Sequence, residues 1–531
     1  MLLKRFVILG VAALSMMACT ETPKDQSPHI LLIMADDMGF SDLGCYGSEI
    51  PTPNLDALAD QGVRFSQFKN TSRCCPSRAA LLTGRHQHSV EMGWMTAVDE
   101  HRPGYRGQLS STVPTIAELF RENDYHTYMS GKWHVSLDGS WEDPESEPNG
   151  SWPTERGFER YYGSLAGGGS YYTPKGLMLQ DKRITTVPED YYYTTAITKN
   201  AVQFIEEHPS DKSMFMYLAH YAPHRPLQAP AAMVEAHREK YRVGYDKLKE
   251  ARYIGLIREG LVPEGYDLPL HHTEYGGKRP AWDELDDATK ERWVTEMATF
   301  SAMIEIMDEG IGQVINTLKE KGMYDNTIIL FLSDNGATNE GGFVSQLAAD
   351  LSNTPYRSYK GFTHLGGVSS PLIIHYPKKY KALNGSILND VAHITDLLPT
   401  CIDMANISYP NTFNGQPLSP PHGRSLAGLL EGGQRKAQDQ FFEHRGNCAI
   451  LSGKWRMVKL AREEQWQLYQ LEHDPFEQHD VAADYPEKVQ ELQVKWMTWA
   501  QNNKVLPLES KPWTPRINYY KNLNPDQDGI D

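Results

Sequence analysis

Residues 29–40 read HILLIMADDMGF, an apolar run of strand length that stops at two adjacent aspartates, Asp36 and Asp37. An apolar run without alternation is typical of a strand that is buried on both faces, as in a parallel sheet covered by helices. A second run, NTIILFLSDN at residues 326–335, ends in the same way at Asp334 and Asn335. Ligands of such sheets bind beyond the carboxyl ends of the strands, so we expect these two polar endings to share one edge.

Two further apolar runs end in polar residues of other kinds. HTYMSGKWHV at 126–135 carries Lys132 and His134, and MFMYLAHYAPHRP at 214–226 carries His224. Helical segments lie between the runs, such as TPNLDALADQG at 52–62, which has a Thr cap, Pro in the first turn and a Gly stop. This alternation predicts an α/β fold with a mostly parallel central sheet flanked by helices.

Asp36, Asp37, Asp334 and Asn335 would place hard oxygen ligands at the same rim. Ca²⁺ prefers such a set, whereas Mg²⁺ would usually keep more water. One such pair alone is more often a solvated turn or a helix cap. Two pairs at the ends of strands together favour a metal site.

The stretch TSRCCPSRAALLTGR at 71–85 predicts a short helix, with Pro in its first turn and Gly84 past its end. Cys74 and Cys75 would then lie at the helix N-terminus, where free N–H groups favour an anion, and Arg78 adds positive charge. Lys132, His134, His224 and Lys360 are each unremarkable alone, since every one has a plain structural or surface interpretation. Together they describe a pocket for a tetrahedral oxyanion ester, either sulfate or phosphate.

Composition limits the classes of partner. Lys and Arg number 52 and Asp and Glu number 68, so the formal net charge is −16 and the surface as a whole should repel nucleic acid. An anionic substrate would therefore need a local basic pocket. Six cysteines in 531 residues do not form a disulfide framework or a repeated zinc spacing, and the length allows a large domain plus a smaller one.

The N-terminal residues MLLKRFVILGVAALSMMAC have a basic start, an apolar run and small residues before Cys19, which indicates a secretory signal over 1–18. The segment resembles a bacterial lipoprotein cleavage box, which would make Cys19 the lipidated first residue of the mature chain and 19–27 its tether. An ordinary signal peptide is the second interpretation. Either one predicts an exported protein, in the periplasm or on the outer membrane or cell surface of a bacterium.

These motifs together resemble the type I, formylglycine-dependent sulfatases, in the arylsulfatase-like branch of the alkaline phosphatase superfamily. The resemblance runs in order along nearly the whole mature chain, through ADDMGFSDLGCYG, CCPSRAALLTGR, SGKWHV, APHRPLQAP, LSDNGA and GGVSSPLIIHYP. Its most specific element is Cys-x-Pro-Ser-Arg followed by Leu-Thr-Gly-Arg, which fits Cys74 and leaves Cys75 as the variable position. One departure is HLGG at 364–367, where many relatives have His-Glu-Gly-Gly, so Leu365 stands in the acidic position.

The resemblance implies an alkaline phosphatase-like catalytic domain over 28–432. A C-terminal subdomain over 433–531, with a short antiparallel sheet and a helix near 486–502, would close one side of the cleft. It implies that a maturation enzyme oxidises Cys74 to formylglycine, whose hydrate attacks sulfur. The implied ligands of one Ca²⁺ are Asp36, Asp37, Cys74 in its modified form, Asp334 and Asn335. The implied catalytic residues are Cys74, Arg78, Lys132 and Lys360 around the formylglycine and sulfate, His134 at the aldehyde hydrate, and His224 with Lys360 at the leaving oxygen.

Substrate identity is left open by the sequence. Sulfated carbohydrate is the leading expectation for an exported sulfatase, and small aryl sulfates are the second. A phosphodiesterase or phosphonate hydrolase on the same scaffold is the enzymatic runner-up, against which the CCPSR motif and single-metal ligation argue. A non-catalytic glycan-binding lipoprotein is the third interpretation, against which the intact set of candidate residues argues. Trp94 and the segment 167–174 would either stack on substrate rings or serve packing, and the charged segment 237–293 would either line the substrate entrance or cover the sheet.

Overall fold

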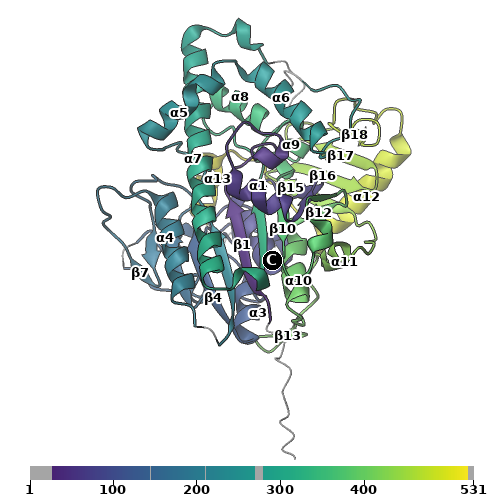
Figure 1. Cartoon of the computed structure of the whole chain (residues 1–531). Coiled ribbons are helices and arrows are strands. Elements are labelled where there is room, and N and C mark those ends of the chain that lie inside the picture. The colour runs from purple at the N-terminus through teal and green to yellow at the C-terminus, as the bar shows by residue number, and fades with distance from the viewer. Residues whose placement is uncertain (1–26, 144, 210, 270–278, 524–531) are drawn as a thin grey trace, which may run out of the picture.

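The computed structural model describes residues 27–143, 145–209, 211–269 and 279–523 (Figure 1). The predicted signal segment and Cys19 lie outside the described residues. At the centre is β1 (His29–Ala35), whose side chains alternate between two hydrophobic cores. Ile30, Leu32 and Met34 pack into one core, while Leu31 and Ile33 pack into the other. Both faces of the strand are therefore buried, which explains its uninterrupted apolar sequence.

Ten strands of the described residues form the main sheet, in the order β11-β2-β10-β9-β1-β8-β4-β5-β6-β7. Their bounds, besides β1, are β2 (Val63–Phe65), β4 (Tyr125–Gly131), β5 (Arg160–Ser164), β6 (Leu177–Leu179), β7 (Lys182–Arg183), β8 (Ser213–Ala219), β9 (Thr327–Ser333), β10 (Leu372–His375) and β11 (Ser386–Leu388). The central strands β9, β1, β8, β4 and β5 are parallel. β10 pairs antiparallel with β9 and β2, and β6 pairs antiparallel with β5 and β7, so the sheet is mixed. The predicted fold class is confirmed.

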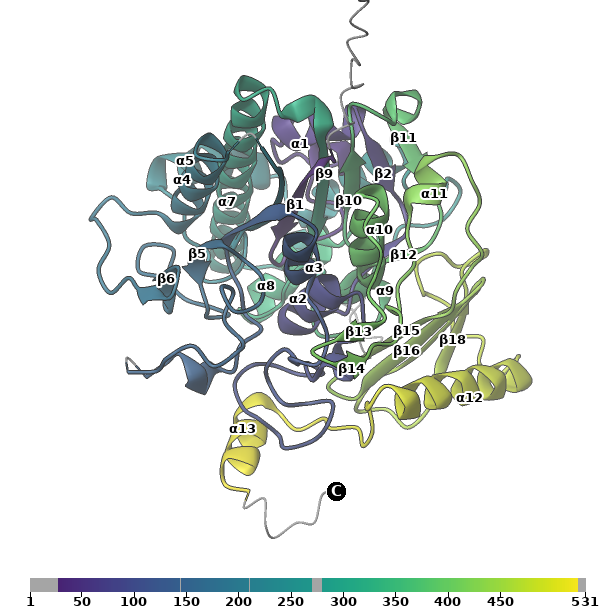
Figure 2. The same ribbon diagram turned by 90° about the horizontal axis from the view of Figure 1, so that it is seen from below.

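Helices cover both faces of this sheet (Figure 2). The core that contains Ile30 also holds residues of α2 (Cys74–Thr83), α3 (Ile116–Glu122), α10 (Leu397–Met404) and α11 (Ala427–Leu430). The core that contains Leu31 holds residues of α1 (Pro53–Asp60), α4 (Tyr193–Glu206), α5 (Ala231–Tyr241), α6 (Tyr245–Arg258), α7 (Asp287–Glu320), α8 (Phe343–Ser352) and α9 (Leu365–Val368). Two small pairs of strands lie apart from the main sheet: β3 (Phe68–Lys69) with β12 (Ala392–His393), and β13 (Thr412–Phe413) with β14 (Gln416–Pro417).

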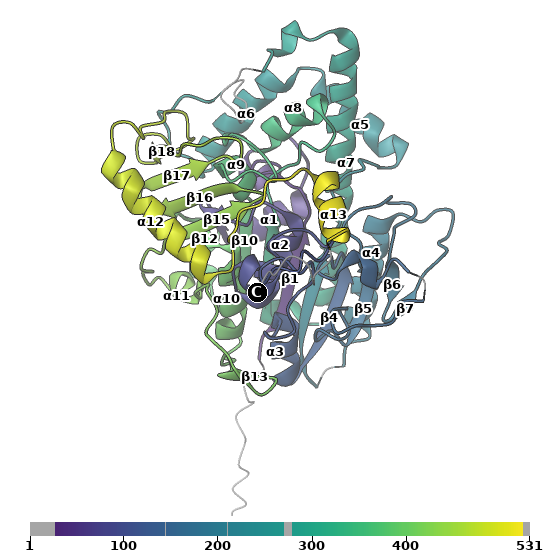
Figure 3. The same ribbon diagram turned by 180° about the vertical axis from the view of Figure 1, so that it is seen from behind.

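The C-terminal part contains an antiparallel sheet with α12 (Pro486–Asn502) against one face (Figure 3). Its strands are β15 (Gln440–His444), β16 (Asn447–Ser452), β17 (Trp455–Lys459) and β18 (Gln467–Gln470). Apolar side chains on one face of this sheet pack on Trp496 and Trp499 of α12. Those on the opposite face pack on Val368 of α9. The chain then continues to α13 (Trp513–Lys521). The short antiparallel sheet and the helix over 486–502 are confirmed, while the boundary between residues 432 and 433 stays a prediction.

Within the described ranges, no helix combines the length and apolar character needed to span a bilayer. All cysteines of the described residues have free thiols and are buried: Cys45, Cys74, Cys75, Cys401 and Cys448.

Candidate active site

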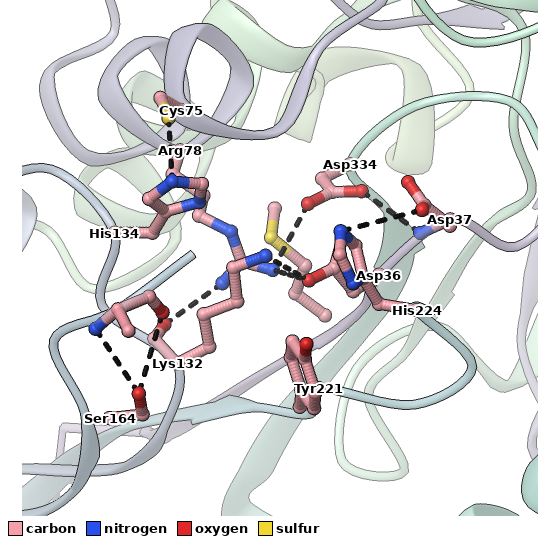
Figure 4. Close-up of polar contacts among 12 residues, drawn as sticks. Asp36, Asp37, Cys75, Arg78, Lys132, His134, Ser164, Tyr221, His224 and Asp334 are labelled. Atoms are coloured by element: carbon pink, nitrogen blue, oxygen red, sulfur yellow. Dashed lines mark hydrogen bonds and ion pairs between the residues drawn. The ribbon is translucent and has the colours of Figure 1, made fainter. Parts of the chain in front are cut away.

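The carboxyl ends of β1, β4, β8 and β9 bring the predicted residues together at one edge of the sheet (Figure 4). Register is the reason: Ala35 of β1 pairs with Ser333 of β9, and Gly131 of β4 pairs with Ala219 of β8. The residues that follow β1, β9 and β4 therefore enter the same space. Asp36, Asp334 and Lys132 are all fully buried there.

Close backbone approach at this edge requires glycine. Gly131 has φ of +124°, and a Cβ added to it would lie 1.8 Å from the carbonyl oxygen of Ala219. A Cβ on Gly167 would lie 1.9 Å from Nε2 of His134, which itself has φ of +57°. Because the backbone of His134 is left-handed, the extended conformation of β4 does not continue beyond Lys132. The two side chains instead point to different partners.

Acidic and amide side chains form a cluster of oxygen atoms. Asn335 Nδ2 donates to Asp37 Oδ1 at 2.6 Å, and the backbone N–H of Asp37 donates to Asp334 Oδ1 at 3.3 Å. Burial and the charge of Asp36 raise the pKa of Asp334 well above its usual range. Oδ1 of Asp36 and Oδ1 of Asn335 are buried without a hydrogen-bond partner. Unsatisfied buried oxygens beside repelling carboxylates are the donor set that a hard divalent cation would complete, so the four predicted residues fit a metal.

Three cations surround the cluster. Lys132 Nζ lies 2.5 Å from Asp36 Oδ2, and Lys360 Nζ lies 2.9 Å from Asp37. Arg78 Nη2 lies 3.0 Å from Asp334 Oδ2 and 3.3 Å from Asp36 Oδ2. Burial opposes ionisation of Asp36, yet the charges of Lys132, His224 and Arg78 lower its pKa to about 2. Each carboxylate thus has a cationic partner, as buried charges require.

His224 approaches from the segment after β8. Its Nε2 lies 3.7 Å from Asp37 Oδ2, and its Nδ1 lies within hydrogen-bonding distance of the carbonyl oxygen of Arg225. Burial and the charge of Lys132 lower the pKa of His224. The imidazole therefore faces the cluster in a position to exchange a proton.

The two cysteines begin α2, with Arg73 as the N-cap and Gly84 in the left-handed conformation at the C-cap. The predicted helix is confirmed. The sulfurs of Cys74 and Cys75 and a ring nitrogen of His134 all lie within 4.8 Å of one another, and Cys75 Sγ is 3.1 Å from His134 Nε2. A hydrogen bond from Cys75 lowers the pKa of Cys74, and the charges of His134 and Lys132 lower it further against the effect of burial. Burial raises the pKa of Cys75, so an anionic group is stabilised at position 74 and not at 75.

Comparisons with known proteins give the family. A family model described as Sulfatase matches residues 28–407, and a model of the N-sulphoglucosamine sulphohydrolase C-terminal region matches 359–502. The chain is 31% identical to an arylsulfatase of Klebsiella aerogenes over 79% of this chain and 96% of that protein. The chain belongs to the sulfatase family. It is therefore a sulfuric ester hydrolase, as the sequence predicts.

Two other relatives of this sulfatase have names that state a carbohydrate ligand. An N-acetylglucosamine-6-O-sulfatase of Bacteroides thetaiotaomicron is 26% identical over 92% of this chain and 89% of that protein. The crystal structure of Ps i-CgsB in complex with k-i-k-neocarrahexaose superposes with a TM-score of 0.68 at 25% identity, covering 93% of this chain and 97% of that chain.

One cavity of the sulfatase is lined in part by Cys74 and has a volume of about 390 Å³. Predicted residues in its lining are Cys74, His134 and His224. A wider cleft of about 990 Å³ shares His224 and Glu340 with it and is lined by the N-terminal part of α7. In the described part of the charged segment 237–293, residues of α5 and α6 pack on the core and the start of α7 borders this cleft, while a role at the substrate entrance stays a prediction.

Sequence reasoning missed several residues of the cavity. Glu340 accepts a hydrogen bond from Arg73 at 2.6 Å and lies 3.3 Å from Lys360 Nζ, although its loop has no pattern that marks it. Arg445 and Trp513 come from the C-terminal part and also line the cavity. Trp94 is only 2% exposed and packs on Trp513, with ring centroids 5.1 Å apart, so Trp94 serves packing and Trp513 is the exposed ring.

Leu365 stands where many relatives have an acidic residue, and an acidic side chain from another part of the chain contacts its backbone. The Leu365 side chain is buried in the apolar core, and its backbone N–H donates to Glu477 Oε2 at 2.8 Å. Glu477 comes from the C-terminal part, where its other oxygen lies 3.1 Å from Arg456 Nε. An acidic side chain therefore does reach this turn, from a distant part of the chain.

Proposed function

We propose that this sulfatase hydrolyses sulfate esters of carbohydrates, with formylglycine at position 74 as the nucleophile and Ca²⁺ as the metal. The observation that carries this is the position of Cys74. It is the first residue of α2, the charges of Lys132 and Lys360 act on its thiol, and it is close enough to Asp36 and Asp334 for its charge to affect their pKa values. A helix N-terminus, Lys, Arg and a metal together suit an anionic tetrahedral group such as a sulfate ester.

The metal would be held by Asp36, Asp37, Asp334, Asn335 and the modified residue 74. When bound, Ca²⁺ would supply positive charge that polarises a sulfate oxygen and favours ionisation of the nucleophilic hydroxyl. Asp36 and Asn335 would satisfy their orphaned oxygens in this way. With all three carboxylates ionised, they balance the three cations of the site, so a divalent cation would leave an excess of positive charge that an anionic ester and the ionised nucleophile would offset.

Each cation has a distinct part. Arg78 holds Asp334 and the carbonyl oxygen of Lys132, which fixes the cluster's geometry at the base of the cavity. Lys132 and Lys360 would bind sulfate oxygens as charge develops on them. Lys132 also lies over the ring of Tyr221, 5.3 Å from its centroid, so its chain is held in place by packing.

The histidines would move protons. Burial lowers the pKa of His134 to about 4, so it is a neutral acceptor beside positions 74 and 75 and can take the proton from the group at position 74. His224, at the opposite side of the cluster, would donate a proton to the leaving alcohol oxygen, assisted by the charge of Lys360. The two roles are assigned to two residues because the proton would be removed beside position 74 and delivered on the other side of the cluster.

Carbohydrate is proposed as the substrate class because polar and charged side chains and one exposed aromatic ring, Trp513, line the cavity, and it shares His224 and Glu340 with a wider cleft. The names of the Bacteroides relative and of the neocarrahexaose complex support the same class. Export by the segment 1–18 and anchoring through Cys19 are part of the proposal, since a soluble polysaccharide is met outside the cytoplasm.

The test is made on protein expressed with a formylglycine-generating enzyme. Mass spectrometry of the peptide that contains Cys74 should show the mass decrease of a thiol converted to an aldehyde. Ion chromatography should then detect sulfate released from sulfated oligosaccharides. Hydrolysis of phosphate diesters to a monoester and an alcohol at a higher kcat/KM, measured by the alcohol released, or no release of sulfate by converted protein, would overturn the proposal.

A further inference from the structure

Arg445 occupies an unusual place in the cavity wall. It lies in the two-residue turn between β15 and β16, with φ of +53°, and is followed by Gly446 with φ of +79°. Glu443 Oε1 accepts from the backbone N–H of Gly446 at 2.7 Å, which fixes the turn. Asn447 Nδ2 donates to the carbonyl oxygen of Gly361 at 3.0 Å. The turn is thereby tied to the residue that follows Lys360, so Arg445 has a set position relative to the catalytic cluster.

Two arginines near it, Arg73 and Arg516, have acidic partners, whereas none is found for Arg445 among the described residues. Arg73 lies 2.6 Å from Glu340, and Arg516 lies 2.6 Å from Glu100. Among the described residues, no carboxylate lies within ion-pair distance of Arg445 and no hydrogen bond from its guanidinium is found. Burial lowers the pKa of Arg445, repulsion by Arg73 and Arg516 lowers it further, and the charge of Glu340 acts in the opposite direction. A half-buried cation held among cations is stabilised when an anion binds to it.

The remaining lining suits a sugar ring. Trp513 is 41% exposed and is backed by Trp94, so a flat apolar surface faces the cavity. Asp138 accepts from Thr96 Oγ1 at 2.8 Å, and both residues line the same cavity, where they can bond to hydroxyl groups. Stacking and hydroxyl contacts place a ring, while Arg445 selects one of its substituents.

We infer that Arg445 binds a second anionic substituent, a sulfate or a carboxylate, of the carbohydrate whose scissile sulfate lies at position 74. This rests on the proposed function and narrows it: the preferred substrate carries at least two anionic groups within the span of one cavity. The guanidinium does not distinguish a sulfate from a carboxylate, because its planar fork pairs with the oxygens of either group. Arg445 is thus a specificity-determining residue and not a catalytic one.

The experiment uses converted enzyme and matched pairs of sulfated disaccharides. One set of pairs differs by a second sulfate, and another differs by a uronic acid carboxylate against the corresponding neutral sugar. Sulfate release gives kcat/KM for each member. We expect the dianionic member of at least one pair to be preferred, and Arg445→Gln to reduce that preference by about 10- to 100-fold, the worth of a charge-assisted hydrogen bond. The pair that responds identifies sulfate or carboxylate as the second anion.

Arg445→Lys should restore part of the preference because it keeps the charge without the fork. Arg121→Gln, an exposed arginine at the end of α3, is the matched control and should leave the preference unchanged. Thermal unfolding confirms that each variant is folded. Equal kcat/KM within every pair, or a preference that survives Arg445→Gln in folded enzyme, would overturn the inference while sulfate release still upholds the proposed function. No sulfate release from any disaccharide by converted enzyme would instead refute both.

Discussion

At the start of α2 two adjacent thiols meet opposite environments. Cys74 has its pKa lowered by the Cys75 hydrogen bond and by His134, while burial raises the pKa of Cys75. We expect Cys74→Ala to abolish sulfate release, because no other residue can supply the proposed nucleophile. Cys75→Ala should lower kcat only modestly, since it removes a neighbour of His134 and no reacting group. Comparable losses of activity in both folded variants, measured by ion chromatography, would contradict this assignment.

A second prediction concerns the leaving oxygen. A sugar alkoxide needs a proton to depart, whereas 4-nitrophenolate does not. His224→Gln should therefore lower kcat for a sugar sulfate by about 10²- to 10⁴-fold and lower kcat for 4-nitrophenyl sulfate much less. His126→Gln, whose ring lies 2.7 Å from Glu159 outside the cavity, is the control. Equal losses of kcat on the two substrates would show that His224 contributes to substrate binding and does not protonate the leaving oxygen.

At the scale of elements, the C-terminal sheet holds the segment that carries Lys360. Glu477 accepts from the N–H of Leu365 at the start of α9, and its partner Arg456 donates to the carbonyl oxygen of Thr363. Glu477 and Arg456 side chains are fully buried. This arrangement connects β17 and the loop after β18 to the active-site edge of the large sheet.

We expect Glu477→Ala to lower the free energy of unfolding by about 3–5 kcal/mol, because it leaves the Arg456 guanidinium buried without its anion. Urea unfolding measures this, and kcat should fall as well because the Lys360 segment loses its support. The double variant Glu477→Leu with Arg456→Met should recover much of the stability. Glu491→Ala, at an exposed ion pair of α12, should change stability little. If Glu477→Ala lowers the free energy of unfolding no more than Glu491→Ala does, the buried Glu477–Arg456 pair does not hold the C-terminal sheet to the Lys360 segment.

The sequence predicted the features that depend on local pattern. The apolar runs of β1 and β9 and the Pro and Gly limits of α2 have periods and end signals, so strand ends and the helix N-terminus could be placed. Glu340 and Arg445 could not be found, because each lies in a loop or turn and reaches the cavity only through pairing of distant segments. Leu365 could be recognised as a departure, but Glu477, 112 residues away along the chain, could not be named as its partner.

For the whole molecule, the active-site edge is where otherwise separate parts meet. β1, β9 and α2 each bring charged groups to it, and the described carboxylates there repel one another when ionised. A bound ion that contacts all three elements would have no comparable site in the unfolded chain. Its binding free energy should therefore appear as stability of the entire catalytic domain.

Ca²⁺ should consequently raise the unfolding temperature of chelator-treated protein. At a free concentration of 100 times Kd the gain is about 2.7 kcal/mol, and it should grow with the logarithm of Ca²⁺ concentration. Asp334→Asn should remove this dependence, because it takes one charge from the proposed ligand set. Asp308→Asn changes a buried carboxylate that accepts from Asn54 and Leu55 at the contact of α1 and α7, so it should shift the unfolding temperature yet keep the Ca²⁺ increment. Because the readout is thermal unfolding, it bears on the metal site whether or not Cys74 has been converted. An increment that survives Asp334→Asn would place the ion elsewhere.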